Sequence, residues 1–159
     1  LFNLMQSSPT MFWLLSRSLL WQILDDRCTD RFVCRLVWER LGYCPDTQNV
    51  WRAGLSTPNY WSISFPLAPE IISVRFASVR LTRSVAKEHK QLLKTQLLFT
   101  GYKIGELYPR RTRRATAVSW LLAWLAVHGY QLSEVGPHPS ELSVPVNPLL
   151  GHPGDPNVS

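Results

Sequence analysis

Four segments of the chain carry apolar residues at the spacing of an α-helix, and proline or glycine lies between them. In the first, residues 12–27, an apolar residue recurs every four positions at Leu15, Leu19 and Ile23. On a helix this spacing gives one wide apolar stripe, which leaves water only by packing against another element. The pattern predicts a mostly α-helical fold in which amphipathic helices share one core.

Three further helices follow from the same reasoning. They are predicted at residues 31–41, at residues 84–99 and from about Pro109 to Gly129. Thr29 or Asp30 can cap the second helix, because a short side-chain oxygen accepts from the free amides of a first helical turn. Gly42 can end that helix in a left-handed conformation, and Ser84 is the expected cap of the third. The predicted architecture is a compact four-helix domain.

The segments between these helices are predicted to be less regular. Residues 43–69 contain several prolines and scattered aromatic rings without periodicity, which indicates a long connection pinned to the core by its rings. Residues 71–83 are rich in β-branched side chains that partly alternate, which predicts one or two short strands or an extended basic segment lying on the helices. A possible short β element is therefore expected near residues 71–82.

Composition divides the chain into three parts. Residues 1–10 are expected to be a flexible leader and residues 11–130 a single helical domain. Residues 131–159 contain six prolines and many small polar residues, which cannot bury enough apolar surface to fold. This Pro-rich tail is therefore predicted to be disordered.

The cysteines and the apolar N-terminal run indicate the compartment. Cys28, Cys34 and Cys44 form no Cys-x-x-Cys pair, so neither a zinc site nor a redox motif is indicated. An odd number of cysteines favours free thiols in a reducing compartment. The apolar run of residues 11–24 is too short to span a bilayer and has Arg17 in its middle. We therefore expect a cytoplasmic protein with no membrane span.

Charge is distributed unevenly along the chain. Eleven of the 17 basic residues lie between Arg75 and Arg114, where only Glu88 and Glu106 oppose them, so this stretch carries 11 − 2 = +9. The residues before it balance six cations against six anions, and no Lys or Arg follows Arg114. Such asymmetry predicts an acidic partner.

Nine residues of this stretch are the candidate partner-binding residues. They are Lys87, Lys90, Lys94, Lys103, Tyr108, Arg110, Arg111, Arg113 and Arg114. The three lysines of the predicted third helix share its outer face. The four arginines begin the last helix, where the helix dipole disfavours cations, so something must offset that cost. A bound phosphate or carboxylate would offset it. So would pairing with the chain's own carboxylates, at Asp25, Asp26, Asp30, Glu39 or Glu106, and both explanations stay open here.

Nucleic acid is the alternative to an acidic protein partner. The third helix, a glycine-containing turn and the basic beginning of the last helix imitate a helix-turn-helix arrangement. The connection before Arg114 is much longer than the usual turn, however, and the last helix is mostly apolar after it. Tyr102 and Tyr108 beside cations could stack on bases.

No catalytic constellation is indicated. Asp26, Asp30, Glu39 and Asp46 could gather a divalent cation through oxygen ligands, but solvated helix faces and caps explain them better. No glycine-rich nucleotide-binding pattern occurs, and no serine has an evident His/Asp partner. We therefore predict a protein that is not an enzyme and needs no metal or other cofactor.

Two blocks of the sequence resemble a known family. The block from Lys90 to Leu125, with Tyr-Pro-Arg-Arg-Thr-Arg-Arg at its centre, is similar to domain of unknown function 1823, a family found mainly in cyanobacteria. The segment from Asp30 to Tyr43 resembles that family's early helix. The resemblance covers about residues 18–128. It implies a cyanobacterial, cytoplasmic setting and transfers no catalytic residue. We expect an accessory or regulatory module that docks an acidic protein surface through its basic patch.

Overall fold

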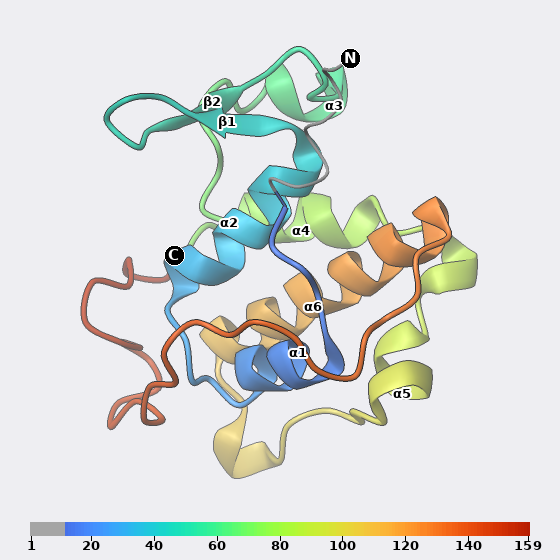
Figure 1. Cartoon of the computed structure of the whole chain (residues 1–159). Coiled ribbons are helices and arrows are strands. Elements are labelled where there is room, and N and C mark those ends of the chain that lie inside the picture. Colours follow the sequence, from blue (N-terminus) through green and yellow to red (C-terminus); the bar gives the residue numbers. More distant parts are fainter. Residues whose placement is uncertain (1–11) are drawn as a thin grey trace.

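The computed structural model describes residues 12–159, and in this range the chain is mostly α-helical, as predicted (Figure 1). The α-helices are α1 (Arg17–Leu24), α2 (Asp30–Leu41), α3 (Asn59–Ser62), α4 (Arg75–Arg83), α5 (Leu92–Leu97) and α6 (Pro109–His128). Two 3-10 helices, η3 (Lys87–His89) and η4 (Ile104–Glu106), and two antiparallel strands, β1 (Tyr43–Pro45) and β2 (Trp51–Ala53), complete the fold. The predicted leader, residues 1–10, lies outside the described residues.

The long helix α6 is the centre of the molecule. It packs against α1, α2, α4 and α5, which surround it in Figure 1. Its buried residues include Val118, Leu121 and Leu125, whose spacing of three and four places them on one face. Pro109 occupies the first turn, where a missing N–H costs nothing. Gly129 ends the helix at φ 73°. Both ends of the last predicted helix are therefore confirmed.

The first helix is shorter than predicted. It begins at Arg17 instead of near Phe12, because the Ser16 hydroxyl accepts a hydrogen bond from the backbone N–H of Leu19 and so caps the helix there. The second helix agrees with prediction. Thr29 caps it in the same way, and Gly42 ends it at φ 87°.

The small β element lies elsewhere than predicted. β1 and β2 pair within the connection of residues 43–69, with Cys44 opposite Arg52. The expected strands at residues 71–83 are wrong, because most of this segment forms helix α4. Ala77 and Leu81 lie four residues apart on its buried face, against α6. Packing on α6 therefore overrides the β propensity of the segment.

The third predicted helix is also interrupted. Ser84 is the C-cap of α4 and not the beginning of a new helix, since its backbone N–H donates to Arg80 and its hydroxyl donates to Leu81. Residues 84–99 then form η3 and the short helix α5 in place of one helix. The ammonium of Lys90 folds back to donate to the backbone carbonyl of Thr82 at 3.1 Å.

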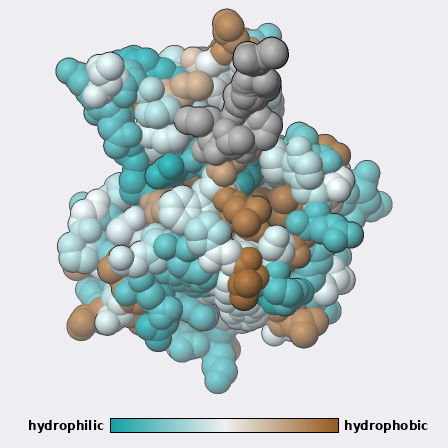
Figure 2. Space-filling view, viewed as in Figure 1, coloured by the Kyte–Doolittle hydropathy of each residue, from teal (hydrophilic) through white to brown (hydrophobic). Residues whose placement is uncertain are grey.

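The hairpin β1–β2 and helix α3 form a small lobe above the helical body (Figures 1 and 2). Aromatic side chains attach it to α2. The indole N–H of Trp38 donates to the Pro69 carbonyl at 2.7 Å, and the Trp38 and Trp51 rings lie 5.7 Å apart. The expectation that rings pin this connection to the core is confirmed for these residues.

The tail contains no helix or strand, but it is docked on the helices and not disordered as predicted. It crosses α1 and returns toward the beginning of α2 (Figure 1). The backbone N–H of Arg17 donates to Ser133 at 2.7 Å, and that of Leu142 donates to Arg27 at 2.9 Å. The tail has little apolar surface to bury, and these hydrogen bonds hold it on the helices.

Candidate partner-docking surface

Three of the four arginines at the beginning of α6 lie inside the protein. The Arg110 side chain is 1% exposed, that of Arg114 is fully buried, and that of Arg111 is 10% exposed. They face Asp26, just after α1, and Asp30, in the first turn of α2. The contacts between α6 and both helices bring these charges together.

Each arginine is paired with a carboxylate. Arg110 binds Asp26 through both terminal nitrogens and donates from Nε to Asp30 at 3.1 Å. Arg111 donates from Nε to Asp26 at 3.2 Å. Arg114 donates from Nη1 to Asp30 at 2.8 Å and from Nη2 to the Cys28 carbonyl at 3.0 Å. We call these five charged residues the arginine–aspartate cluster.

The pKa values of the two aspartates respond differently to this cluster. Burial opposes the ionisation of Asp26, but the hydrogen bonds and charges of Arg110, with help from Arg114 and Arg111, outweigh it and lower its pKa. At Asp30, burial is the stronger influence. It raises the pKa of Asp30 although Arg114 and Arg110 act against it.

The prediction that Arg110, Arg111 and Arg114 form part of an exposed patch is therefore wrong. The cost of placing cations at a helix N-terminus is offset by Asp26 and Asp30, which the sequence analysis had named as possible partners. The sequence could not decide, because Arg110 and Asp26 are 84 residues apart. A carboxylate close in space but distant in sequence leaves no local signal.

Arg113 and Tyr108 are half-buried and serve the fold in a different way. The guanidinium of Arg113 donates to the backbone carbonyls of Ile72 and Ser73 at 2.9 and 3.1 Å. The ring of Tyr108 lies 5.4 Å from the guanidinium of Arg111. Both residues also line a surface hollow together with Arg75.

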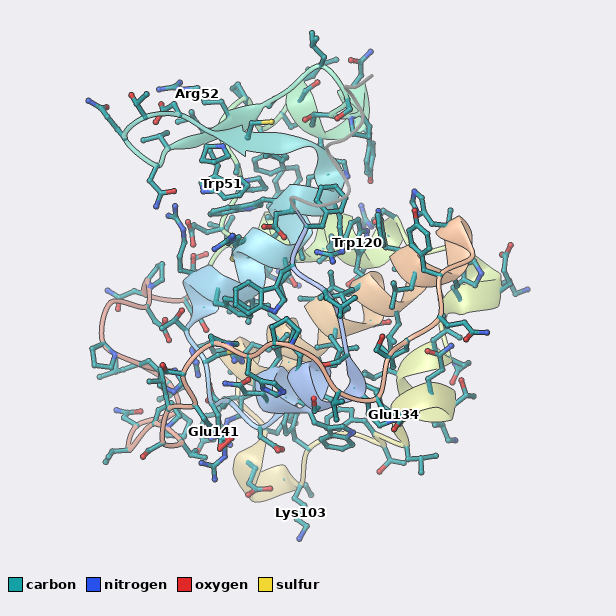
Figure 3. The ribbon with its side chains drawn as sticks, viewed as in Figure 1. Trp51, Arg52, Lys103, Trp120, Glu134 and Glu141 are labelled. Carbon is teal, nitrogen blue, oxygen red and sulfur yellow. The ribbon has the colours of Figure 1, made fainter. Side chains whose placement is uncertain are left out.

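The four predicted lysines are exposed. Lys87 belongs to η3, Lys90 follows it and Lys94 lies in α5, while Lys103 precedes η4 and points away from the body in Figure 3. Arg83, at the end of α4, is also exposed, and it precedes η3 in the chain. We call Arg83, Lys87, Lys90 and Lys94 the 83–94 cation cluster.

The 83–94 cation cluster is not neutralised by the part of the chain that the structure describes. None of its four members forms an ion pair with residues 12–159. Glu88 is the one acidic residue within this stretch, so it carries 4 − 1 = +3. These cations are therefore exposed without a counter-charge from residues 12–159, but the three lysines belong to η3, its end and α5, and not to one face of a single helix as expected.

The other carboxylates considered as metal ligands do not converge. Glu39 binds Arg35 at 3.0 Å and accepts from the backbone N–H of Trp13 at 3.1 Å. Asp46 accepts from backbone amides in the β1–β2 turn and pairs with Arg52 at 3.2 Å. Among residues 12–159 no group of three or more His, Cys, Asp or Glu side chains is placed to hold a metal ion.

Sequence reasoning missed one half-buried feature, the surroundings of Arg80. Its guanidinium lies within 4.7 to 6.0 Å of four ring centroids, those of Tyr60, Trp61, Phe65 and Phe76. Cation–π attraction and a hydrogen bond to the Tyr60 carbonyl hold it there. The aromatic residues of 60–65 were the available signal in the sequence. Their contact with Arg80 could not be predicted, because helix α4, which carries Arg80, was not predicted.

Fold and site together define a small helical domain whose last helix carries a buried arginine–aspartate cluster. A family model described as "Domain of unknown function (DUF1823)" matches residues 14–126, and the chain belongs to this family.

One solved structure, titled "Solution NMR structure of the protein", is 42% identical in sequence. The match covers 75% of this chain and 99% of that one, with a TM-score of 0.65. A search of curated proteins finds no match. No helix among residues 12–159 is both long and apolar enough to cross a membrane.

Proposed function

We propose that this protein is a non-enzymatic accessory or regulatory module that docks an acidic protein surface through the 83–94 cation cluster. The observation that carries the proposal is the exposure of all four cations without a carboxylate partner among residues 12–159. The carboxylates Asp26, Asp30 and Glu39 are buried and already paired with other arginines. An acidic partner would supply the missing counter-charge and speed association.

A protein partner is favoured over nucleic acid by what lies beside the cations. Leu98, one turn beyond Lys94, is 77% exposed. An apolar side chain next to charges suits a protein interface, in which an apolar contact is surrounded by a polar rim. The phosphate backbone of a nucleic acid offers nothing for it. The proposal places the module in the cytoplasm, in a cyanobacterial setting like that of the family resemblance.

The test compares two variants of equal charge. In the first, Arg83, Lys87, Lys90 and Lys94 are changed together to Gln. In the control, four cations elsewhere in the chain, Arg17, Arg27, Arg31 and Arg52, are changed to Gln. Both variants are used as bait in nuclease-treated lysate of the source cell, and their folding is checked by urea unfolding.

We expect wild type and control to recover the same acidic protein and the first variant to lose it. Equal recovery by both variants would refute the proposal. Nucleic acid is tested with a fluorescent DNA duplex and an RNA oligomer. The alternative function replaces the proposed one if binding to either depends on the 83–94 cation cluster and weakens with salt. The expected log–log slope is about −0.9 per phosphate contact on the duplex and about −0.7 on a single strand.

A further inference from the structure

The tail inserts a carboxylate into the arginine–aspartate cluster. Asp155 has a side chain that is 1% exposed, and its Oδ2 lies 3.3 Å from Nη2 of Arg110. Its Oδ1 accepts a hydrogen bond at 3.0 Å from the backbone N–H of Asp30, in the first turn of the twelve-residue helix α2. A helix N-terminus and a guanidinium together bind a carboxylate well.

The charge of the cluster requires such a group. Arg110, Arg111 and Arg114 oppose Asp26 and Asp30, which leaves 3 − 2 = +1 in a buried region. Asp155 brings this sum to zero. A buried uncompensated charge is costly, so an anion at the position of Asp155 stabilises the cluster.

The occupant and the site belong to different parts of the chain. The five residues of the cluster lie within residues 14–126, which the family model matches, whereas Asp155 lies beyond them in the tail. The tail that carries it has no helix or strand of its own. The site is thus built by the family domain and filled by an appended segment.

We infer that the N-terminal ends of α2 and α6 form a carboxylate-binding socket, held in this structure by Asp155 of the tail and open to an Asp or Glu side chain of a protein partner when the tail is displaced. This inference deepens the proposed function and rests on its acidic protein partner. The tail then acts as an internal competitor for that partner.

Two tail glycines provide a variant that displaces the tail and a matched control, and neither substitution changes any charge. A Cβ atom on Gly151 would lie 2.4 Å from Oδ2 of Asp155 and 2.5 Å from Nε of Arg110. Gly151→Ala should therefore push the tail away from the socket. Gly154 also has a positive φ, of 90°, but a Cβ there would meet nothing within 4 Å. Gly154→Ala is the matched control, because it adds the same strain without the clash.

The test measures binding of a synthetic peptide, residues 147–159 of this chain, to full-length variants by fluorescence anisotropy. We expect Gly151→Ala to bind the labelled peptide, and wild type and Gly154→Ala to bind it at least about tenfold more weakly because their own tail competes. A peptide with Asp155→Asn should bind Gly151→Ala at least about tenfold more weakly, since it lacks the charge-assisted bonds. No peptide binding to Gly151→Ala, or equal binding of the two peptides, would overturn the inference.

A second full-length variant guards against misfolding of the first. Asp155→Asn weakens the tail by charge instead of by a clash, and it should bind the wild-type peptide as well. If both variants unfold while Gly154→Ala folds, the tail is a permanent part of the fold and the inference is wrong. No lysate is involved, so this test can fail while the proposed docking through the 83–94 cation cluster succeeds, and the reverse.

Discussion

Arg114 shows how one buried side chain connects several elements. Its guanidinium donates to the Ile23 carbonyl at 3.0 Å, to Asp30 at 2.8 Å and to the Cys28 carbonyl at 3.0 Å. It thus joins α6 to the end of α1, the connection after it and the beginning of α2. Methionine has a similar length but offers no donor.

We predict that Arg114→Met lowers the free energy of unfolding by about 3–5 kcal/mol, because Asp30 loses a partner inside the protein. Urea unfolding followed by circular dichroism measures this loss. The double variant Arg114→Met with Asp30→Asn should be less destabilised than the two single effects added together, since no unpaired charge then remains. Strict additivity would contradict the pairing.

The sequence identified some members of this cluster and missed another for clear reasons. Asp26 and Asp30 were named as possible partners because they are acidic and lie near the predicted second helix. Asp155 was not, because its neighbours predict a disordered segment. Composition reports how little apolar surface the tail can bury, but not that Arg110 offers it a charged contact.

The buried thiol of Cys34 makes the protein less stable at alkaline pH. It is fully buried in α2, and this burial, with a smaller contribution from Glu70, raises its pKa from 9.0 to about 12. Between these values the unfolded chain has lost the thiol proton and the folded chain keeps it. The free energy of unfolding therefore falls as pH rises, by about 1.4 kcal/mol per pH unit for this one group.

We predict that Cys34→Ala makes the fall in stability from about pH 9 to about pH 11 less steep by that amount, whatever its effect at neutral pH. The slope is measured by urea unfolding at several pH values. Cys44→Ala is the control, because it removes an exposed thiol in place of a buried one. Equal slopes in wild type and Cys34→Ala would show that this thiol titrates alike in both states.

At the scale of elements, α4 shows where periodicity can mislead. The β-branched residues of 71–83 suggested strands, but Ala77, Leu81 and Val85 recur every four residues and are buried. The segment thus contained both the alternation of a strand and the four-residue spacing of a helix. Contact with α6 favours the helix. The last helix offered no such choice, and Pro109 and Gly129 mark its two ends in the sequence, so both ends were predicted correctly.

The two glycines that end α2 and α6 provide the element-scale prediction. Both have a positive φ, of 87° at Gly42 and 73° at Gly129. An added Cβ would lie 3.0 Å from the backbone nitrogen of Thr57 at Gly42, and it would meet nothing within 4 Å at Gly129. We predict a loss of about 1 kcal/mol for Gly129→Ala from backbone strain alone. Gly42→Ala should lose at least about 1 kcal/mol more, because the lobe must shift. Thermal unfolding of both variants measures the difference, and similar losses would contradict the close contact of lobe and helix.

For the whole molecule, the charges fall into two populations. Arg110, Arg111 and Arg114 are balanced inside by Asp26, Asp30 and Asp155. The rest of the chain has 17 − 3 = 14 cations and 11 − 3 = 8 anions, so the full net charge of 14 − 8 = +6 lies outside the cluster. The cluster stabilises the fold, and the net positive charge of the chain lies outside it.

Salt should weaken partner binding, which depends on exposed charges, without weakening the fold, which depends on buried ones. Raising sodium chloride from about 0.05 M to about 0.5 M shortens the screening length severalfold, which weakens exposed charges far more than buried ones. We predict that recovery of the acidic partner falls steeply over this range, while the free energy of unfolding at pH 7 does not fall, because the buried pairs persist and repulsion among the surface cations is reduced. Binding and urea unfolding are measured in the same buffers, with the Gln variant of the 83–94 cation cluster as control. Its unfolding should depend less on salt than that of wild type. A parallel loss of stability and binding would mean that the same charges serve both roles, and the division between an internal cluster and an external docking surface would then be incorrect.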